Sequence, residues 1–183
     1  MPALMALLLA GSGTTSGLKG TAGNSVVVRD FVDKASEHAK DSDRQRKQAQ
    51  MRRVTKDFAD MVAWEIGRGH AFQQVVRNGT EDEKTLVLTG QITRYEEGDP
   101  NLRLWVGMGA GSSYFDARIE LLKGGSGELQ GTIEANRNSW VLDGGIAATQ
   151  TPDGFMREAA KKVAEELCTR KAGRAPAAIA DGK

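Results

Sequence analysis

Cysteine and histidine are almost absent from this sequence. Cys168 is the single cysteine, so the chain cannot form an internal disulfide bond or a zinc site built from several cysteines. His38 and His70 are too few and too isolated in sequence to form a good zinc site. We therefore expect no bound metal and no cofactor.

Neither sign of charge dominates the sequence either. The 25 Lys and Arg residues and the 24 Asp and Glu residues leave a net charge of +1. This balance provides no global field to attract nucleic acid or an anionic membrane, so we expect no nucleic-acid partner. One basic segment contains Arg44, Arg46, Lys47, Arg52 and Arg53. Because aspartates dilute it and no aromatic residues interleave, we interpret it as a solvated helix face.

The apolar run at the start of the chain, residues 1–10, is too short to cross a bilayer, which needs roughly 20 residues. It fits the apolar core of a secretory signal, followed by a linker rich in Gly, Ser and Thr. The end of this run also resembles a bacterial lipoprotein signal, with Ser12 in place of the lipid-bearing cysteine. Serine cannot form the thioether to diacylglycerol, so a lipid anchor requires cysteine at native position 12. We expect export with processing at Ser12, and the alternative is a first helix or disordered leader in a cytosolic protein.

Two segments have the apolar periodicity of helices that each bury one face. In residues 43–66, one stripe contains Met51, Val54, Phe58, Met61, Val62 and Ile66. Glu65 also falls in this stripe, whereas Trp64 falls outside it. A second helix is predicted to begin at Thr151-Pro152-Asp153, and its apolar face contains Phe155, Met156, Ala159, Val163 and Leu167. Both helices need a sheet on which to pack.

Short β-branched or alternating segments predict the strands of that sheet. They are residues 26–28, 72–76, 86–95, 102–106, 114–122 and 129–135. The order is a strand, a helix, a run of antiparallel strands and a final helix. This order predicts an α+β two-layer sandwich, with a mainly antiparallel sheet of about five or six strands and two helices on one face. We expect residues 1–23 to be leader and linker, residues 24–170 to be one domain, and residues 171–183 to be a disordered tail.

The central segment carries a family resemblance. Its residues are Gly90-Gln91-Ile92 through Tyr95, Gly98 in a turn, Arg103, the run from Gly107 to Ser112, and the strand that ends at Leu122. In these residues the chain resembles the domain-of-unknown-function 4410 family of bacterial exported, often lipoprotein, proteins. The resemblance implies a location in the cell envelope and provides no catalytic residues. The expected location is the periplasm or the periplasmic face of the outer membrane.

Five glycines, Gly90, Gly98, Gly107, Gly109 and Gly111, lie in or beside the predicted strands. The last three invite comparison with a phosphate-binding loop, which needs a following helix and usually a lysine. Strands are predicted on both sides of these glycines and no lysine closes the motif. We interpret all five as structural glycines at bends, bulges or close backbone approaches.

The sequence gives little support for a catalytic role of any residue. Glu96, Glu97 and Asp99 cluster in a turn-like segment, but nothing in the sequence indicates the buried carboxyl pair that acid–base catalysis needs. Cys168 would need a nearby base to act as a nucleophile, and its position near a helix end favours a partly exposed, inert thiol. We therefore predict no catalytic residue.

Arg103, Trp105 and Trp140 are the candidate partner contacts, because exposed tryptophan beside arginine is typical of interface hot spots. The alternative is that both tryptophans are covered by a helix or loop. We expect a non-catalytic cell-envelope domain that binds or scaffolds through its sheet surface or sheet edge. Its partner is another envelope protein or a second copy of the chain. The competing hypothesis is a small periplasmic hydrolase or ligand-binding protein.

Overall fold

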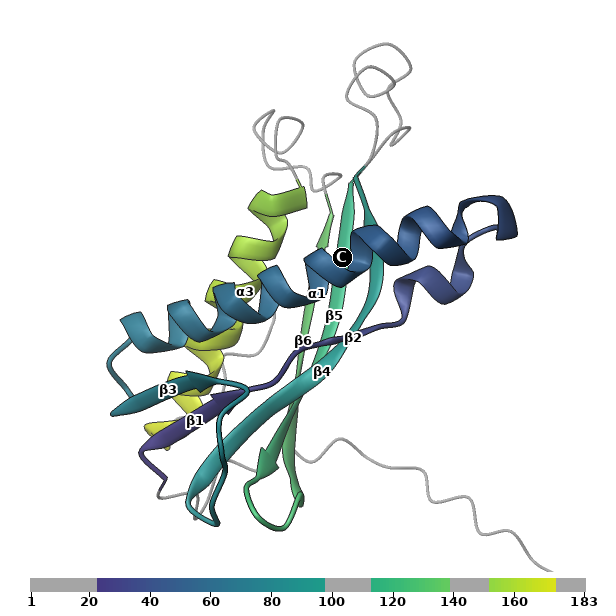
Figure 1. Ribbon diagram of the computed structural model, residues 1–183. Helices are drawn as coiled ribbons and strands as arrows, with labels where there is room; N and C mark the ends of the chain where they lie inside the picture. The colour runs from purple at the N-terminus through teal and green to yellow at the C-terminus, as the bar shows by residue number, and fades with distance from the viewer. Residues whose placement is uncertain (1–22, 98–112, 139–151, 174–183) are drawn as a thin grey trace, which may run out of the picture.

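The computed structural model describes residues 23–97, 113–138 and 152–173 (Figure 1). The elements are β1 (Ser25–Val28), β2 (Val32–Asp33), the 3₁₀ helix η1 (Ala35–His38), α1 (Asp41–Arg68), β3 (Gln74–Arg77), β4 (Thr85–Glu96), β5 (Tyr114–Lys123), β6 (Leu129–Asn138) and α3 (Pro152–Lys171). The predicted leader at 1–22, the predicted strand at 102–106 and most of the predicted tail lie outside the described residues.

The strands form one mixed sheet of six strands in the order β3-β1-β4-β5-β6, with β2 paired to β4. The long pairings of β5 with β4 and with β6 are antiparallel, so the sheet is mostly antiparallel and the predicted α+β class is confirmed. The order of the elements along the chain predicted that successive strands would be antiparallel neighbours in the sheet. Instead, β1 lies between β3 and β4 and runs parallel to both. Parallel pairing of β1 and β3 is possible because α1 connects them across one face of the sheet.

Both helices lie on the same face of the sheet and pack against each other (Figure 1). In α1 the predicted stripe is buried, with Met61 at its margin, and Glu65 is buried as well. Trp64, which falls outside the stripe, is 59% exposed. In α3 all five predicted apolar residues are buried.

Three phenylalanines join the helix layer to the sheet at the centre of the core. The Phe58 ring lies between Phe31 and Phe115, with ring centroids 4.9 Å and 4.7 Å away, in tilted and edge-to-face arrangements. Aromatic pairs at such distances add to the energy of burial. Phe58 and Phe115 are fully buried, so this cluster fixes where α1 crosses β5.

Candidate functional site

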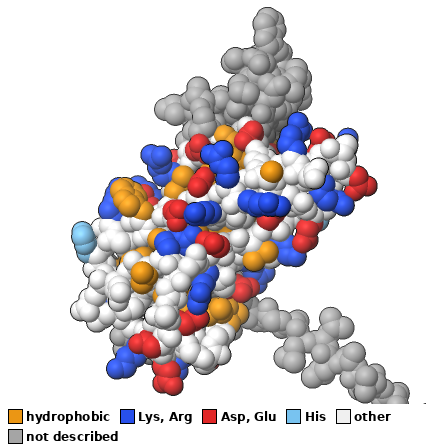
Figure 2. Space-filling model, viewed as in Figure 1, with side chains coloured by type: hydrophobic (Ala, Val, Ile, Leu, Met, Phe, Trp, Pro, Cys, Tyr) orange, Lys and Arg blue, Asp and Glu red, His pale blue; other side chains and the backbone are white. Residues whose placement is uncertain are grey.

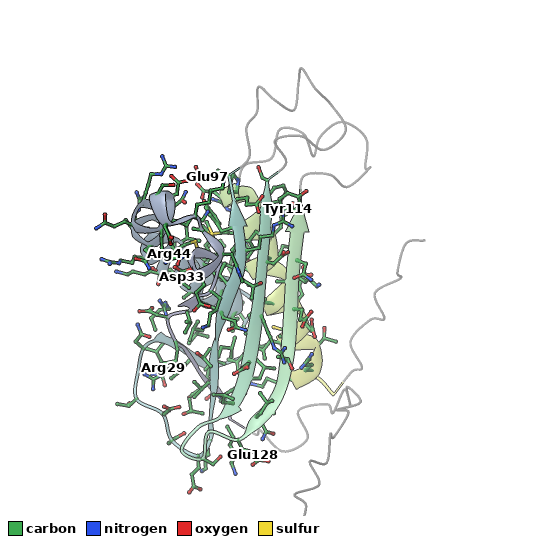
Figure 3. The ribbon with its side chains drawn as sticks, turned by 90° about the vertical axis from the view of Figure 1, so that its right-hand side faces the viewer. Arg29, Asp33, Arg44, Glu97, Tyr114 and Glu128 are labelled. Carbon is green, nitrogen blue, oxygen red and sulfur yellow. The ribbon has the colours of Figure 1, made fainter. Side chains whose placement is uncertain are left out.

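The second face of the sheet is not covered by either helix. In Figure 3, strands β4, β5 and β6 lie in front of α3. Along β5, alternate residues from Phe115 to Leu121 are buried under the helices. The residues between them, together with Leu122, project from the opposite face, because successive side chains of a strand alternate. We call this surface the open face.

A row of aliphatic residues crosses the open face. It contains, in order across five strands, Val76, Val27, Val87, Leu122 and Leu129, each paired in register with the next. Residues opposite each other in paired strands lie on the same face and contact each other. The inner members Val27 and Val87 are buried, whereas the terminal members Val76 and Leu129 are 36% and 55% exposed. We call these five residues the aliphatic row.

Two shallow hollows flank the aliphatic row. The larger, of about 640 Å³, contains Val87, Leu122 and Thr89 together with the hairpin glycines Gly125 and Gly127. The smaller, of about 290 Å³, lies over β1 and β3. Glu81 lines both hollows, and its carboxylate accepts a hydrogen bond of 2.6 Å from Arg29. The row is therefore an apolar floor with a polar rim.

The other end of the open face, near residues Glu97 and Tyr114 in Figure 3, is polar. The guanidinium of Arg94 stacks 3.5 Å from the centroid of the Tyr114 ring, and its Nε donates a 2.9 Å hydrogen bond to Glu96. Asp116 pairs in register with Arg94. Burial raises the pKa of the Asp116 carboxyl above its ordinary value of 3.8, although the charge of Arg94 opposes this effect.

The raised pKa of Asp116 makes stability depend on pH. A carboxyl with a raised pKa in the folded state favours folding below its unfolded pKa, and that contribution is lost as pH rises through the folded pKa. We expect Asp116→Asn to raise the free energy of unfolding at pH 7 by less than about 1 kcal/mol, because the group is only half buried. The gain should vanish below pH 3.8, where the carboxyl is protonated in both states. Urea unfolding at both pH values tests this, and an equal gain at both would contradict it.

The two edges of the sheet differ in how far they are covered. At the β6 edge, α3 supplies cations that bind backbone carbonyls. Lys162 donates to the carbonyl of Glu134 at 3.1 Å, and Arg170 donates to the carbonyl of Thr132 at 2.8 Å. The opposite edge, β3, has four residues. Covered or short edges discourage the addition of another strand, so the open face is the better candidate surface.

All three candidate partner contacts, Arg103, Trp105 and Trp140, lie outside the described residues. The predicted processing site Ser12 and the predicted structural glycines Gly98, Gly107, Gly109 and Gly111 lie outside them as well. Gly90 lies in β4, where an added Cβ would approach the carbonyl oxygen of Arg118 to 2.2 Å. The exposed tryptophan that the structure does describe is Trp64, stacked with Arg68 at 4.8 Å. Its place outside the apolar stripe was the signal that could have marked it as a candidate contact.

The basic start of α1 carries charges of both signs. Arg44 and Arg46 pair with Asp41 and Asp43 at 2.9 Å and 3.1 Å. On the face of the molecule that α1 crosses, Figure 2 shows Lys and Arg side chains mixed with Asp and Glu. This mixture gives no single-sign surface for a polyanion.

The titratable groups of the described residues do not gather into a catalytic centre. Glu96 and Glu97 are both exposed, so they do not form a buried pair. Burial lowers the pKa of Lys47 and raises that of Tyr95, and neither residue lines a hollow of the open face. Within the described ranges, no three His, Cys, Asp or Glu side chains are placed to hold a metal ion. No helix in these ranges is both long and apolar enough to cross a membrane.

The family described as a domain of unknown function, DUF4410, matches residues 26–142. The chain is similar to several solved structures, among them the following two. The PelC dodecamer from Paraburkholderia phytofirmans has 14% identity, with 88% of this chain and 93% of that chain covered and a TM-score of 0.49. A DUF330 protein from Xanthomonas campestris has 12% identity, coverage of 81% and 88%, and a TM-score of 0.47. No curated protein matches the sequence. The family match spans α1 and the sheet and ends before α3.

Proposed function

Because the chain belongs to the DUF4410 family, we propose that it is a non-catalytic binding or scaffolding domain of the bacterial cell envelope. It binds its protein partner through the open face of the sheet. The observation that carries this proposal is the aliphatic row, which crosses five strands on the face that neither helix covers. The envelope location is supported by the apolar leader at residues 1–10 and by the family.

The aliphatic row has the composition of an interface centre. Two of its members remain substantially exposed, although water contact with apolar side chains is unfavourable. Arg29 and Glu81 line the hollow that contains Val87 and Leu122, and Arg118 and Glu134 pair in register farther along the same face. An apolar centre with a polar rim is the usual anatomy of a protein–protein interface.

A second copy of the chain is the partner to test first. We expect the purified full chain to self-associate in sedimentation velocity, and the double substitution Val76→Lys with Leu129→Lys to weaken association at least about 30-fold. Two ammonium groups would then have to be buried at the apolar centre, at a combined cost of about 2 kcal/mol or more. The stability of the monomer should hardly change, because both side chains are exposed.

The matched control is Val32→Lys. Val32 in β2 is 53% exposed, like Leu129, but lies outside the aliphatic row. This variant should associate like the original chain. Equal weakening by Val32→Lys would contradict a role specific to the row. A wild-type chain that stays monomeric at about 100 μM, well above the micromolar range of specific complexes, would exclude the second copy as the partner.

The location is tested by fractionating the native host and measuring the intact mass of the mature protein. Envelope recovery with a mass lacking the first eleven or twelve residues supports export. Added acyl mass would show that the native chain has cysteine at position 12. A full-length protein in the cytosol would contradict the envelope assignment.

A further inference from the structure

A groove runs between the second half of α1 and α3, on the layer opposite the open face. Its volume is about 270 Å³. The lining residues are Glu65, Arg68, Gly69, Lys161, Ala164, Glu165 and Cys168. The groove is therefore lined by two small residues, Gly69 and Ala164, and by charged side chains from both helices.

Glu65 is the unusual member of this groove. Its side chain is only 9% exposed, and no group among the described residues donates a hydrogen bond to its carboxylate. The nearest cation atom is Nε of Arg68, 4.0 Å from Oε2, which is too long for a hydrogen bond. A buried carboxylate without a hydrogen-bond donor is costly, and native proteins give nearly all buried polar groups a hydrogen bond.

The cations at the rim of the groove also make other contacts, and the ion pair of Arg68 with Glu65 lacks a hydrogen bond. The guanidinium of Arg68 stacks on the ring of Trp64 at 4.8 Å, and Nζ of Lys161 lies 3.9 Å from Glu165. Trp64 is 59% exposed, so an exposed indole is stacked on a guanidinium that lines the groove. Tryptophan and arginine next to a desolvated pocket are the residues that dominate protein interfaces.

We propose that this groove is a second protein-binding site, which accepts an arginine or lysine side chain of a partner. The cationic head of that side chain donates to the carboxylate of Glu65, and its aliphatic stem packs against Ala164 and Gly69. Charge complementarity selects this occupant, because the buried group that lacks a donor is an anion. The site goes beyond the open face, since it lies on the other layer and works without the aliphatic row.

The single cysteine provides a direct readout, because Cys168 lines the groove. Alkylation of the full chain by iodoacetamide is followed at one fixed pH, since burial raises the pKa of the Cys168 thiol. The probe is N-acetyl-arginine methylamide, and the citrulline analogue serves as the neutral isostere at equal ionic strength. We expect the arginine probe at about 10 mM to slow alkylation roughly threefold or more, as a millimolar ligand would. The citrulline analogue should have little effect.

Two matched variants identify the carboxylate. Glu65→Gln should abolish protection by the arginine probe, whereas Glu165→Gln, which changes an exposed carboxylate on the same rim, should retain it. Glu65→Gln should also raise the thermal midpoint by about 3 °C, because it removes a buried charge that has no donor. A purely structural carboxylate would instead lower the midpoint when replaced.

Several results would overturn the proposal. They are absence of protection by the arginine probe, equal protection by the citrulline analogue, loss of protection in Glu165→Gln, and a lowered midpoint in Glu65→Gln. None of these readouts depends on Val76 or Leu129, so failure here is distinguishable from failure of the open face.

Discussion

Replacing Phe58 with alanine is expected to lower the free energy of unfolding by about 3–5 kcal/mol. The ring is fully buried and contacts both Phe31 and Phe115, so its removal leaves a cavity between α1 and the sheet. Domains of this size are stable by about 5–15 kcal/mol, so the loss is a large share of the total. Urea unfolding at pH 7 measures it.

The matched control is Trp64→Ala, which removes a larger aromatic ring from the same helix. Trp64 is mostly exposed and contacts Arg68 by stacking, so this change should cost less than about 1 kcal/mol. Similar losses for the two variants would mean that α1 does not pack on the face that its apolar stripe indicates.

Replacing Gly90 with alanine is expected to cost about 3 kcal/mol, at the upper end of typical overpacking penalties. The added Cβ would lie 2.2 Å from the carbonyl oxygen of Arg118 and 3.0 Å from both Cα of Ile119 and the Phe31 ring. Two of these three atoms belong to the backbone of β5, which cannot rotate away. Strands β4 and β5 would have to separate at the middle of their pairing.

Gly67→Ala is the control for this substitution. Gly67 lies in α1, and an added Cβ there meets no atom within 4 Å. Alanine should stabilise the helix by up to about 1 kcal/mol, because it loses less backbone entropy than glycine. The two Gly→Ala changes should therefore have opposite signs, and a neutral Gly90→Ala would contradict the close approach of β4 and β5.

The sequence predicted the helices well because their apolar periodicity is a local signal. The stripe from Met51 to Ile66 is the buried face of α1, and the exposed place of Trp64 also follows from it. The family resemblance, based on the central segment, is confirmed as well.

Long-range pairing could not be predicted in the same way. Nothing in the run Val26 to Val28 indicates that β1 inserts between β3 and β4, because the partners of a parallel strand depend on the path of the connecting helix. The aliphatic row could not be predicted from the sequence for the same reason. Val27, Val87 and Leu122 belong to separate strands, and only the register of the folded sheet aligns them.

The candidate site could be predicted from the sequence only in part. Arg103, Trp105 and Trp140 remain predictions, since they lie outside the described residues. Trp64 falls outside the apolar stripe, and a tryptophan at such a position is exposed unless a partner covers it. The buried Glu65 was visible as a charge in the stripe, and only the structure shows that it lacks a donor.

The aliphatic row as the centre of the partner-binding surface is tested most directly by photo-cross-linking in the native host. Benzoylphenylalanine replaces Leu129, within the row, in one strain and Val32, exposed on the same face but outside the row, in another. We expect position 129 to give a defined protein adduct, either with a second copy or with another envelope protein, and position 32 to give none. An adduct from position 32 without one from position 129, or no adduct from either, would contradict the proposed binding surface.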